Sequence, residues 1–148
     1  MPDIFDITKH LPDILGGSNA PKPENNVEEK LSALRRETVE KPVIFLGTGT
    51  CGLGAGAAKT LKAINTYISE KEIEADVKEV GCIGLCVEEP LLDIQLPGKC
   101  RLSFRKVTAD KVNGILDSVF SSEIDPDQVI GQHRGLGGEL WQDVRCLD

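Results

Sequence analysis

Hydrophobic and polar positions along the chain follow two periods, which predict where its helices and strands lie. Apolar side chains spaced three or four positions apart indicate amphipathic helices. Such helices are predicted at 27–34, 57–68 and 112–120. Short apolar runs and strict alternation of apolar and polar residues indicate strands instead. Such strands are predicted at 43–46, 73–80, 91–96 and 100–104.

Turn and cap residues mark the boundaries between the later elements. Pro97-Gly98 fits the two central positions of a type II turn, so the strands on either side of it are expected to form a hairpin. Thr108 precedes the last predicted helix and is expected to cap it. The sequence does not decide whether the peptide bond before Pro90 is cis or trans.

The order of these elements predicts the fold class. A strand–helix–strand unit is followed by a strand–strand–helix unit, and right-handed crossovers leave few ways to join the two in one sheet. This βαβ-ββα order is the thioredoxin-like arrangement of the α/β class. We therefore expect a mixed sheet of about four strands flanked by helices.

Composition divides the chain into three parts. The compact domain is predicted at 43–120. An N-terminal arm at 1–42 precedes it, in which a linker rich in proline and glycine at 16–23 comes before the short helix. A polar, glycine-rich tail at 121–148 follows, and Trp141 is expected to anchor this tail onto its own domain.

Net charge and hydropathy narrow the classes of function. The 148 residues include 24 acidic and 17 basic side chains, which gives a net charge of −7. An acidic chain without a basic stripe is a poor binder of nucleic acid. No apolar run approaches the ~20 residues of a membrane span, and the acidic start lacks the features of a secretory signal. We therefore expect a cytoplasmic protein that binds no nucleic acid.

Three of the five cysteines carry the candidate chemistry. Cys51 lies in the glycine-rich loop at 47–56, directly after the first strand, and Cys82 and Cys86 lie in the loop after the second strand. Because both strands of a parallel βαβ unit end at the same edge of the sheet, the three thiols are expected to converge. Without a secretory signal, spaced cysteines indicate a metal, cluster or redox site rather than disulfides.

Three kinds of site remain open for these thiols. Iron–sulfur clusters take four thiolates, zinc takes three cysteines together with a nitrogen or oxygen ligand, and free thiols serve redox chemistry. Cys100 and Cys146 are expected to be small buried side chains instead.

The glycine-rich loop has a second interpretation. Gly47, Gly49 and Gly52 form a GxGxxG pattern between a strand and a helix, which is typical of dinucleotide binding. A cysteine loop and a hairpin follow it here, rather than the further βαβ unit of that fold. The cysteine interpretation is therefore favoured.

The remaining polar candidates are expected to be structural or solvated. His10 and His133 are single imidazoles without a paired carboxylate, and Glu88 and Glu89 follow the second cysteine loop. No Ser–His–Asp or Cys–His pairing indicates a hydrolase. Hydrolysis therefore has no visible machinery in this sequence.

Three segments resemble a known family. They are GTGTCG at 47–52, VGCIGLCVEEP at 80–90 and VTADKV at 107–112. Together they resemble the thioredoxin-like [2Fe-2S] ferredoxin domains of NADH-oxidising modules, found in complex I-type dehydrogenases, NAD-linked iron hydrogenases and NAD-dependent formate dehydrogenases. The resemblance implies a [2Fe-2S] cluster bound by Cys51, Cys82 and Cys86. It also implies an electron carrier or accessory subunit, rather than an independent catalyst, beside flavin/NADH-binding and iron–sulfur subunits of a redox complex.

One ligand position departs from the family. Its pattern is C-x4-C followed by C-x3-C, and Leu46 stands where the first cysteine belongs. Cys100 is expected about 20 Å away, because a strand rises ~3.3 Å per residue, whereas Cys146 lies in the tail, from which it can reach the site. Two hypotheses follow. Either a cluster is bound with a fourth ligand from oxygen or a partner, or the domain is a cluster-free docking and assembly module of such a complex.

Overall fold

The computed structural model describes residues 26–134 and 138–147. The helices are α2 (Asn26–Arg35), α3 (Thr50–Gly54), α4 (Ala57–Glu70) and α5 (Val112–Ser121), with a 3₁₀ turn η1 (Cys86–Glu88). The strands are β1 (Val43–Gly47), β2 (Asp76–Val80), β3 (Leu92–Gln95), β4 (Arg101–Phe104), β5 (Val129–His133) and β6 (Cys146–Leu147). The predicted linker at 16–23 and His10 lie outside the described residues.

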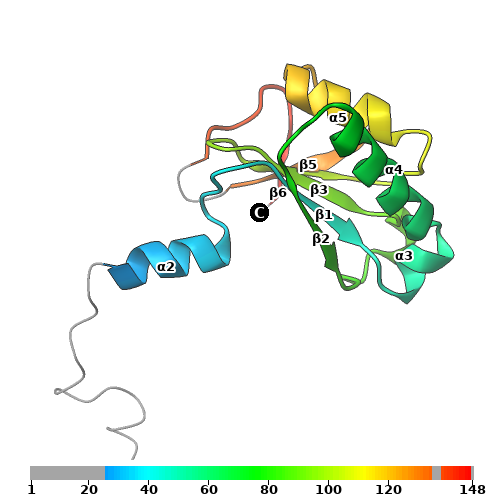
Figure 1. The fold of residues 1–148 in the computed structure, drawn as a ribbon, viewed down its shortest axis with the longest axis horizontal. Coiled ribbons are helices and arrows are strands. Elements are labelled where there is room, and N and C mark those ends of the chain that lie inside the picture. The colour runs from blue at the N-terminus through cyan, green and yellow to red at the C-terminus, as the bar shows by residue number, and fades with distance from the viewer. Residues whose placement is uncertain (1–25, 135–137, 148) are drawn as a thin grey trace, which may run out of the picture.

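All of these strands belong to one sheet, in the order β2-β1-β3-β4-β5-β6 (Figure 1). β1 pairs in parallel with β2, with Leu46 opposite Glu79 and Gly47 opposite Val80. β3 is antiparallel to β1, β4 to β3 and β5 to β4, whereas β6 runs parallel to β5. The sheet is therefore mixed, as predicted, but it has six strands rather than the predicted four or so.

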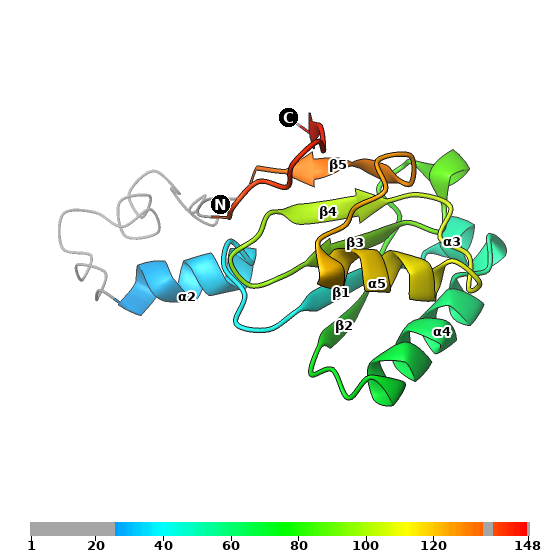
Figure 2. The same cartoon turned by 90° about the horizontal axis from the view of Figure 1, so that it is seen from above.

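Helices α4 and α5 lie together on one face of the sheet (Figure 1). The core fills the space between the helices and the strands, and it includes the fully buried side chains of Ile44, Leu46, Ile64 and Leu116. Because side chains alternate along a strand, Phe45 points to the opposite face. In Figure 2 the two helices again lie on one side of the strands, while α2 projects beyond the strand ends. None of the helices described here is long and apolar enough to cross a membrane.

Strand β2 begins later than the alternation at 73–80 predicts. Glu72 has a φ of 53°, and the N–H of Ile73 donates to the carbonyl oxygen of Ile68 at 3.0 Å. This left-handed residue and its hydrogen bond form the end of α4. The chain therefore joins the sheet only at Asp76, where β2 becomes an edge strand that is exposed toward its end.

Two local predictions have different outcomes. The turn before β4 is confirmed, because Gly98 has a φ of 73° and its position suits a type II turn. The predicted cap of α5 is wrong. The carbonyl oxygen of Thr108 accepts the N–H of Lys111 at 2.9 Å in a turn that precedes the helix, and Lys111 occupies the N-cap without a side-chain bond. The Glu89–Pro90 peptide bond is cis.

The segment at 121–148 adds β5 and β6 to the sheet, although its sequence predicts no strand. The pairing of β5 with β4 shifts register between Ser103 and Phe104, which breaks the simple alternation. A Cβ on Gly131 would lie only 2.7 Å from Cγ of Leu147. Gly131 therefore makes room for β6, and the same glycine obscures the strand pattern in the sequence.

A buried hydrogen-bond network joins this segment to the sheet. Gln132 is 1% exposed, and its Nε2 donates to the carbonyl oxygens of Trp141 at 3.0 Å and Val144 at 2.6 Å. Its Oε1 accepts the backbone N–H of Trp141 at 2.7 Å, and the indole N–H donates to the carbonyl oxygen of Cys100 at 2.7 Å. Trp141 is buried in the main core. The prediction that it packs on its own domain is confirmed.

Replacing Gln132 by leucine tests this network. Gln132→Leu leaves the Trp141 N–H and two carbonyl oxygens without their partner. Each buried polar group that loses its partner lowers the free energy of unfolding by ~1–3 kcal/mol. We expect the free energy of unfolding in urea to fall by about 2–4 kcal/mol. The exposed Gln142 is the matched control, and Gln142→Leu should change stability by less than about 0.5 kcal/mol. Equal stability of the two variants would contradict the network.

Candidate functional site

The first cysteine loop extends the pairing of β1 with β2 beyond the strand ends. The N–H of Thr48 donates to the carbonyl oxygen of Val80 at 2.9 Å. Helix α3 then begins and carries Cys51 near its start. Gly52 packs so tightly against Gly47 that a Cβ on Gly52 would overlap the carbonyl oxygen of Gly47. The position of Cys51 therefore depends on glycine at the next residue.

The second cysteine loop follows β2 and approaches the first loop closely. Cys82 lies in the irregular segment 81–85, and Cys86 begins η1. Gly84 has a φ of 91°, and its N–H donates to Sγ of Cys82 at 3.3 Å. A Cβ on Gly49 would lie 3.0 Å from the backbone nitrogen of Cys82. Glycine at position 49 thus lets the two loops meet.

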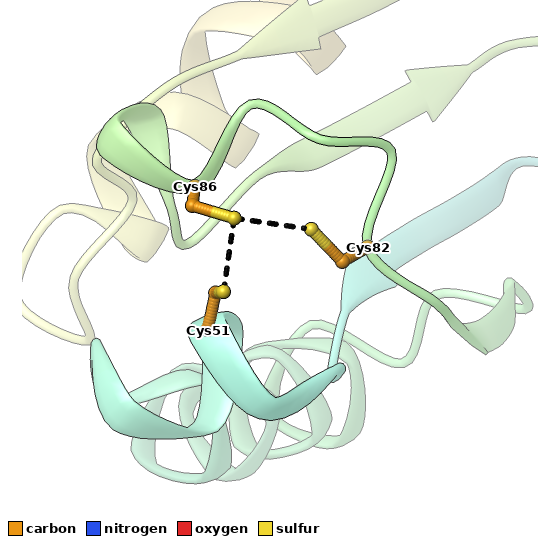
Figure 3. A group of neighbouring side chains, drawn as sticks. All are labelled: Cys51, Cys82 and Cys86. Carbon is orange, nitrogen blue, oxygen red and sulfur yellow. Dashed lines mark hydrogen bonds between the residues drawn. The ribbon is translucent and has the colours of Figure 1, made fainter.

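The three cysteines of these loops converge, as the sequence predicts. Sγ of Cys86 lies 2.9 Å from Sγ of Cys51 and 3.5 Å from Sγ of Cys82 (Figure 3). All three sulfur atoms lie within 4.8 Å of one another. Cys82 and Cys86 are exposed, whereas Cys51 is half-buried. Two thiolates on one tetrahedral metal lie about 3.8 Å apart, because each metal–sulfur bond is ~2.3 Å long, so these three sulfur atoms are near enough to share one metal group.

Among the described residues, no histidine, aspartate, glutamate or further cysteine joins this group of donors. Leu46 is fully buried in the core and offers no donor atom. Cys100 is buried as predicted, and its thiol donates to the carbonyl oxygen of Gly138 at 3.3 Å. Cys146 is half-buried in β6, at the opposite edge of the sheet from β2. The hypothesis that Cys146 reaches the site is therefore not supported by its place in the fold.

Glu89 lies beside the site and is buried, so the interpretation of this side chain as solvated is wrong. It is 6% exposed, and Oε2 accepts the N–H of Leu91 at 2.8 Å. Oε1 is buried and has no hydrogen-bond partner among the described residues. Glu88 is partly exposed, and its Oε2, which is also buried without a hydrogen-bond partner among the described residues, lies 3.8 Å from Nζ of Lys106. Two adjacent glutamates look equivalent in the sequence, and only the fold distinguishes them.

Apolar side chains surround the cysteines at the molecular surface. Ile83 is 74% exposed and Val87 is 81% exposed, while Leu53 of the first loop is 54% exposed. Exposed apolar residues that cluster around one site mark surfaces where another molecule binds. These three exposed side chains form the apolar rim of the cysteine site.

No protein-family model matches this sequence, and no curated protein matches it. Solved structures do match. A structure of a thioredoxin-like [2Fe-2S] ferredoxin from Aquifex aeolicus superimposes with a TM-score of 0.54 at 15% identity, over 68% of this chain and 99% of that chain. A second structure of that wild-type ferredoxin gives a TM-score of 0.52 at 15% identity, over 62% and 98% of the two chains. A cysteine-to-serine variant of that ferredoxin gives a TM-score of 0.53 at 14% identity, over 60% of this chain and 97% of that chain.

These superpositions establish the fold. Together with the strand order β2-β1-β3-β4 and the helices α4 and α5, they confirm the thioredoxin-like α/β class that the element order predicts. The likeness extends over nearly the whole of each matched ferredoxin and leaves about a third of this chain outside it.

Glycine at position 52 is expected to be essential for the geometry of the site. In Gly52→Ala the new methyl group overlaps a backbone carbonyl, and such overpacking lowers the free energy of unfolding by about 1–3 kcal/mol. Gly54→Ala is the matched control, because a Cβ on Gly54 meets nothing within 4 Å. It should leave stability unchanged or raise it by up to ~1 kcal/mol. Urea unfolding of both variants gives the comparison, and equal stability would contradict the assigned packing.

Proposed function

We propose that this protein is an electron-transfer protein that holds a [2Fe-2S] cluster through Cys51, Cys82 and Cys86. The observation that carries the proposal is the convergence of these three thiols from two separate loops. The structural neighbours, which are [2Fe-2S] ferredoxins, support the same assignment. When bound, the cluster supplies a one-electron redox couple.

The residues of the chain prepare this site in two ways. The Gly84 N–H donates to Sγ of Cys82, and a hydrogen bond of this kind stabilises negative charge on a thiolate. Gly49 and Gly52 let the loops approach without side chains between them. Cys82 and Cys86 are exposed, so the site lies at the surface, where an electron can pass to a partner over a short distance.

The fourth ligand must be something other than a cysteine of this chain. All five cysteines belong to the described residues. Cys100 is held in the core by Gly138, and Cys146 lies in β6. We therefore propose that an oxygen ligand or a residue from a partner molecule completes the site, since the family's first cysteine is the buried Leu46 in this chain.

The proposed partners are flavin/NADH-binding and iron–sulfur subunits of an NADH-linked oxidoreductase complex. Support comes from the resemblance of the two cysteine loops to domains of such complexes and from the exposed apolar rim of Leu53, Ile83 and Val87. Such a rim suits contact with another protein surface. We propose a cytoplasmic location as well, since a reducing compartment keeps these thiols available as ligands.

A cluster-free docking module of such a complex is the second candidate. The observation that favours it is the missing fourth donor, because only three ligand atoms meet among the described residues. In this case the apolar rim around the cysteines carries the function, and the thioredoxin-like fold serves as a scaffold. Metal content separates the two candidates.

Anaerobic purification of the full chain decides between them. We expect iron and acid-labile sulfide in equal amounts, a red-brown colour and an electron paramagnetic resonance signal after reduction. Colourless protein without iron would support the docking module, and stoichiometric zinc would assign the site to zinc instead.

A cysteine substitution tests the ligand assignment. Cys82→Ser should remove more than half of the bound iron, because it deletes one of three converging thiolates. Cys146→Ser is the matched control, since that residue lies in β6 at the far edge of the sheet, and it should retain the iron of the natural protein. Iron retained fully in Cys82→Ser would refute the assignment.

A further inference from the structure

An apolar groove of about 390 Å³ crosses the face of the sheet opposite to α4 and α5. One end of it is lined by Val80, Ile83 and Leu85. These side chains are exposed by 38%, 74% and 44%. Ile130 and Leu147 continue the apolar wall and are half-buried. Exposed apolar surface that is gathered in one groove marks a place where another segment or molecule binds.

The other end of the groove is cationic. The guanidinium groups of Arg36 and Arg101 lie 5.4 and 4.4 Å from the ring centroid of Phe45. Phe45 lies two positions before the residue of β1 that pairs with Val80, which sets the two ends apart along the strand. A smaller cavity of about 210 Å³ shares Arg101 with the groove and adds Arg35. Because the whole chain has a net charge of −7, this local positive charge favours an acidic segment.

The acidic side chains that line the two cavities are already engaged. Glu37 lies 3.6 Å from Nη1 of Arg35. Oε2 of Glu89 accepts a backbone N–H, and its Oε1 is inaccessible. Asp93 bonds Ser103, and burial raises the pKa of Asp93, a shift that favours its neutral form. The two guanidinium groups over the aromatic ring are therefore the cations that remain to bind an acidic group.

The N-terminal segment, defined as residues 1–15, has a composition that matches both ends of the groove. It contains three aspartates and one lysine. Its apolar residues recur at intervals of three and four positions, which is the spacing of segments that lay one apolar face into a groove. These residues are Ile4, Ile7, Leu11 and Ile14. The segment thus offers apolar side chains for one end and negative charge for the other.

The chain is long enough to bring this segment to the groove. Arg36 directly follows α2 and lies over Phe45, so the end of α2 adjoins the cationic end. Helix α2 has ten residues and spans about 15 Å, whereas residues 16–25 can reach about 35 Å. Figure 2 shows α2 beyond the strand ends, so a segment that returns along α2 enters at the arginines. Tethered binding acts at roughly millimolar effective concentration, and weak contacts are then sufficient.

We propose that the N-terminal segment binds in this groove on its own chain. Entry from the cationic end places Asp13 beside Arg101 and the earlier Ile4 and Ile7 beside Ile83. Ile83 also belongs to the apolar rim, so the bound segment competes with a partner that contacts the rim. The groove contains none of the three converging cysteines. This inference therefore does not rest on the proposed cluster, and its test applies to protein with or without iron.

Photo-cross-linking of the full chain tests the proposal. With p-benzoylphenylalanine in place of Phe5, which is next to Ile4, we expect cross-links within single chains to the peptide that contains Ile83. The same probe in place of Leu34 is the control, because Leu34 is 80% exposed on α2 and does not line the groove. It should give no product with that peptide. Cross-links between two chains would assign the groove to a second copy and overturn the proposal, as would cross-links elsewhere or none.

A substitution in the groove assigns the cross-link to its apolar end. Ile83→Asp should lower the yield from the probe at position 5 about tenfold, because the apolar contact is lost. Val87→Asp is the matched control, since Val87 follows in the same region, is 81% exposed and does not line the groove. It should leave the yield unchanged. Equal yields in the two variants would refute the apolar contact.

A charge reversal tests the cationic end. Asp13→Arg should lower the yield about threefold, because it places a cation beside Arg101. Adding Arg101→Asp to that variant restores the opposite charges and should restore the yield. Circular dichroism checks the folding of every variant, and where Ile83→Asp fails to fold, the charge reversal decides. A yield that Asp13→Arg does not lower, or that the double variant does not recover, would refute the docking.

Discussion

The parallel pairing of β1 with β2 is the constraint on which the candidate site depends. Gly47 lies opposite Val80, and the Thr48 N–H continues the ladder to the carbonyl oxygen of Val80. The two loops therefore leave the sheet side by side at one edge. A slip of one residue would turn every side chain of β1 to the other face, which would take Leu46 out of the core and separate the loops that carry Cys51 and Cys82.

The loops at the carboxyl ends of β1 and β2 also carry groups that are unfavourable for folding. Ile83 is largely exposed, and Glu89 buries a carboxylate oxygen that has no hydrogen-bond partner within the described part of the chain. An exposed apolar side chain and an unpaired buried carboxylate oxygen are each unfavourable for folding, and proteins keep such features where function requires them. The stabilising contacts lie elsewhere, between the sheet and the helices α4 and α5 and around Trp141.

The sequence predicts those parts of the fold that a local pattern of apolar and polar residues determines, and it does not predict the parts that depend on contacts between distant segments. The apolar stripe of α4 and the alternation in β4 fix those elements, and the βαβ order alone predicts that Cys51 meets Cys82 and Cys86. Strand β5 was not predictable, because Gly131 and the register shift beside it remove the alternation. The burial of Glu89 was not predictable either, since it follows from the packing of two loops that are distant in sequence.

Leu46 links the question of the cluster to the question of the partner. Its side chain faces the helices in a fully buried position, and Cys100 and Cys146 are held by Gly138 and by β6. The chain therefore has no spare cysteine to complete a four-thiolate site. A solvent oxygen as fourth ligand leaves the isolated chain able to retain iron, whereas a ligand from a partner makes retention depend on assembly. In the second case the exposed apolar rim has a direct role, because the contact that covers it also delivers the missing ligand.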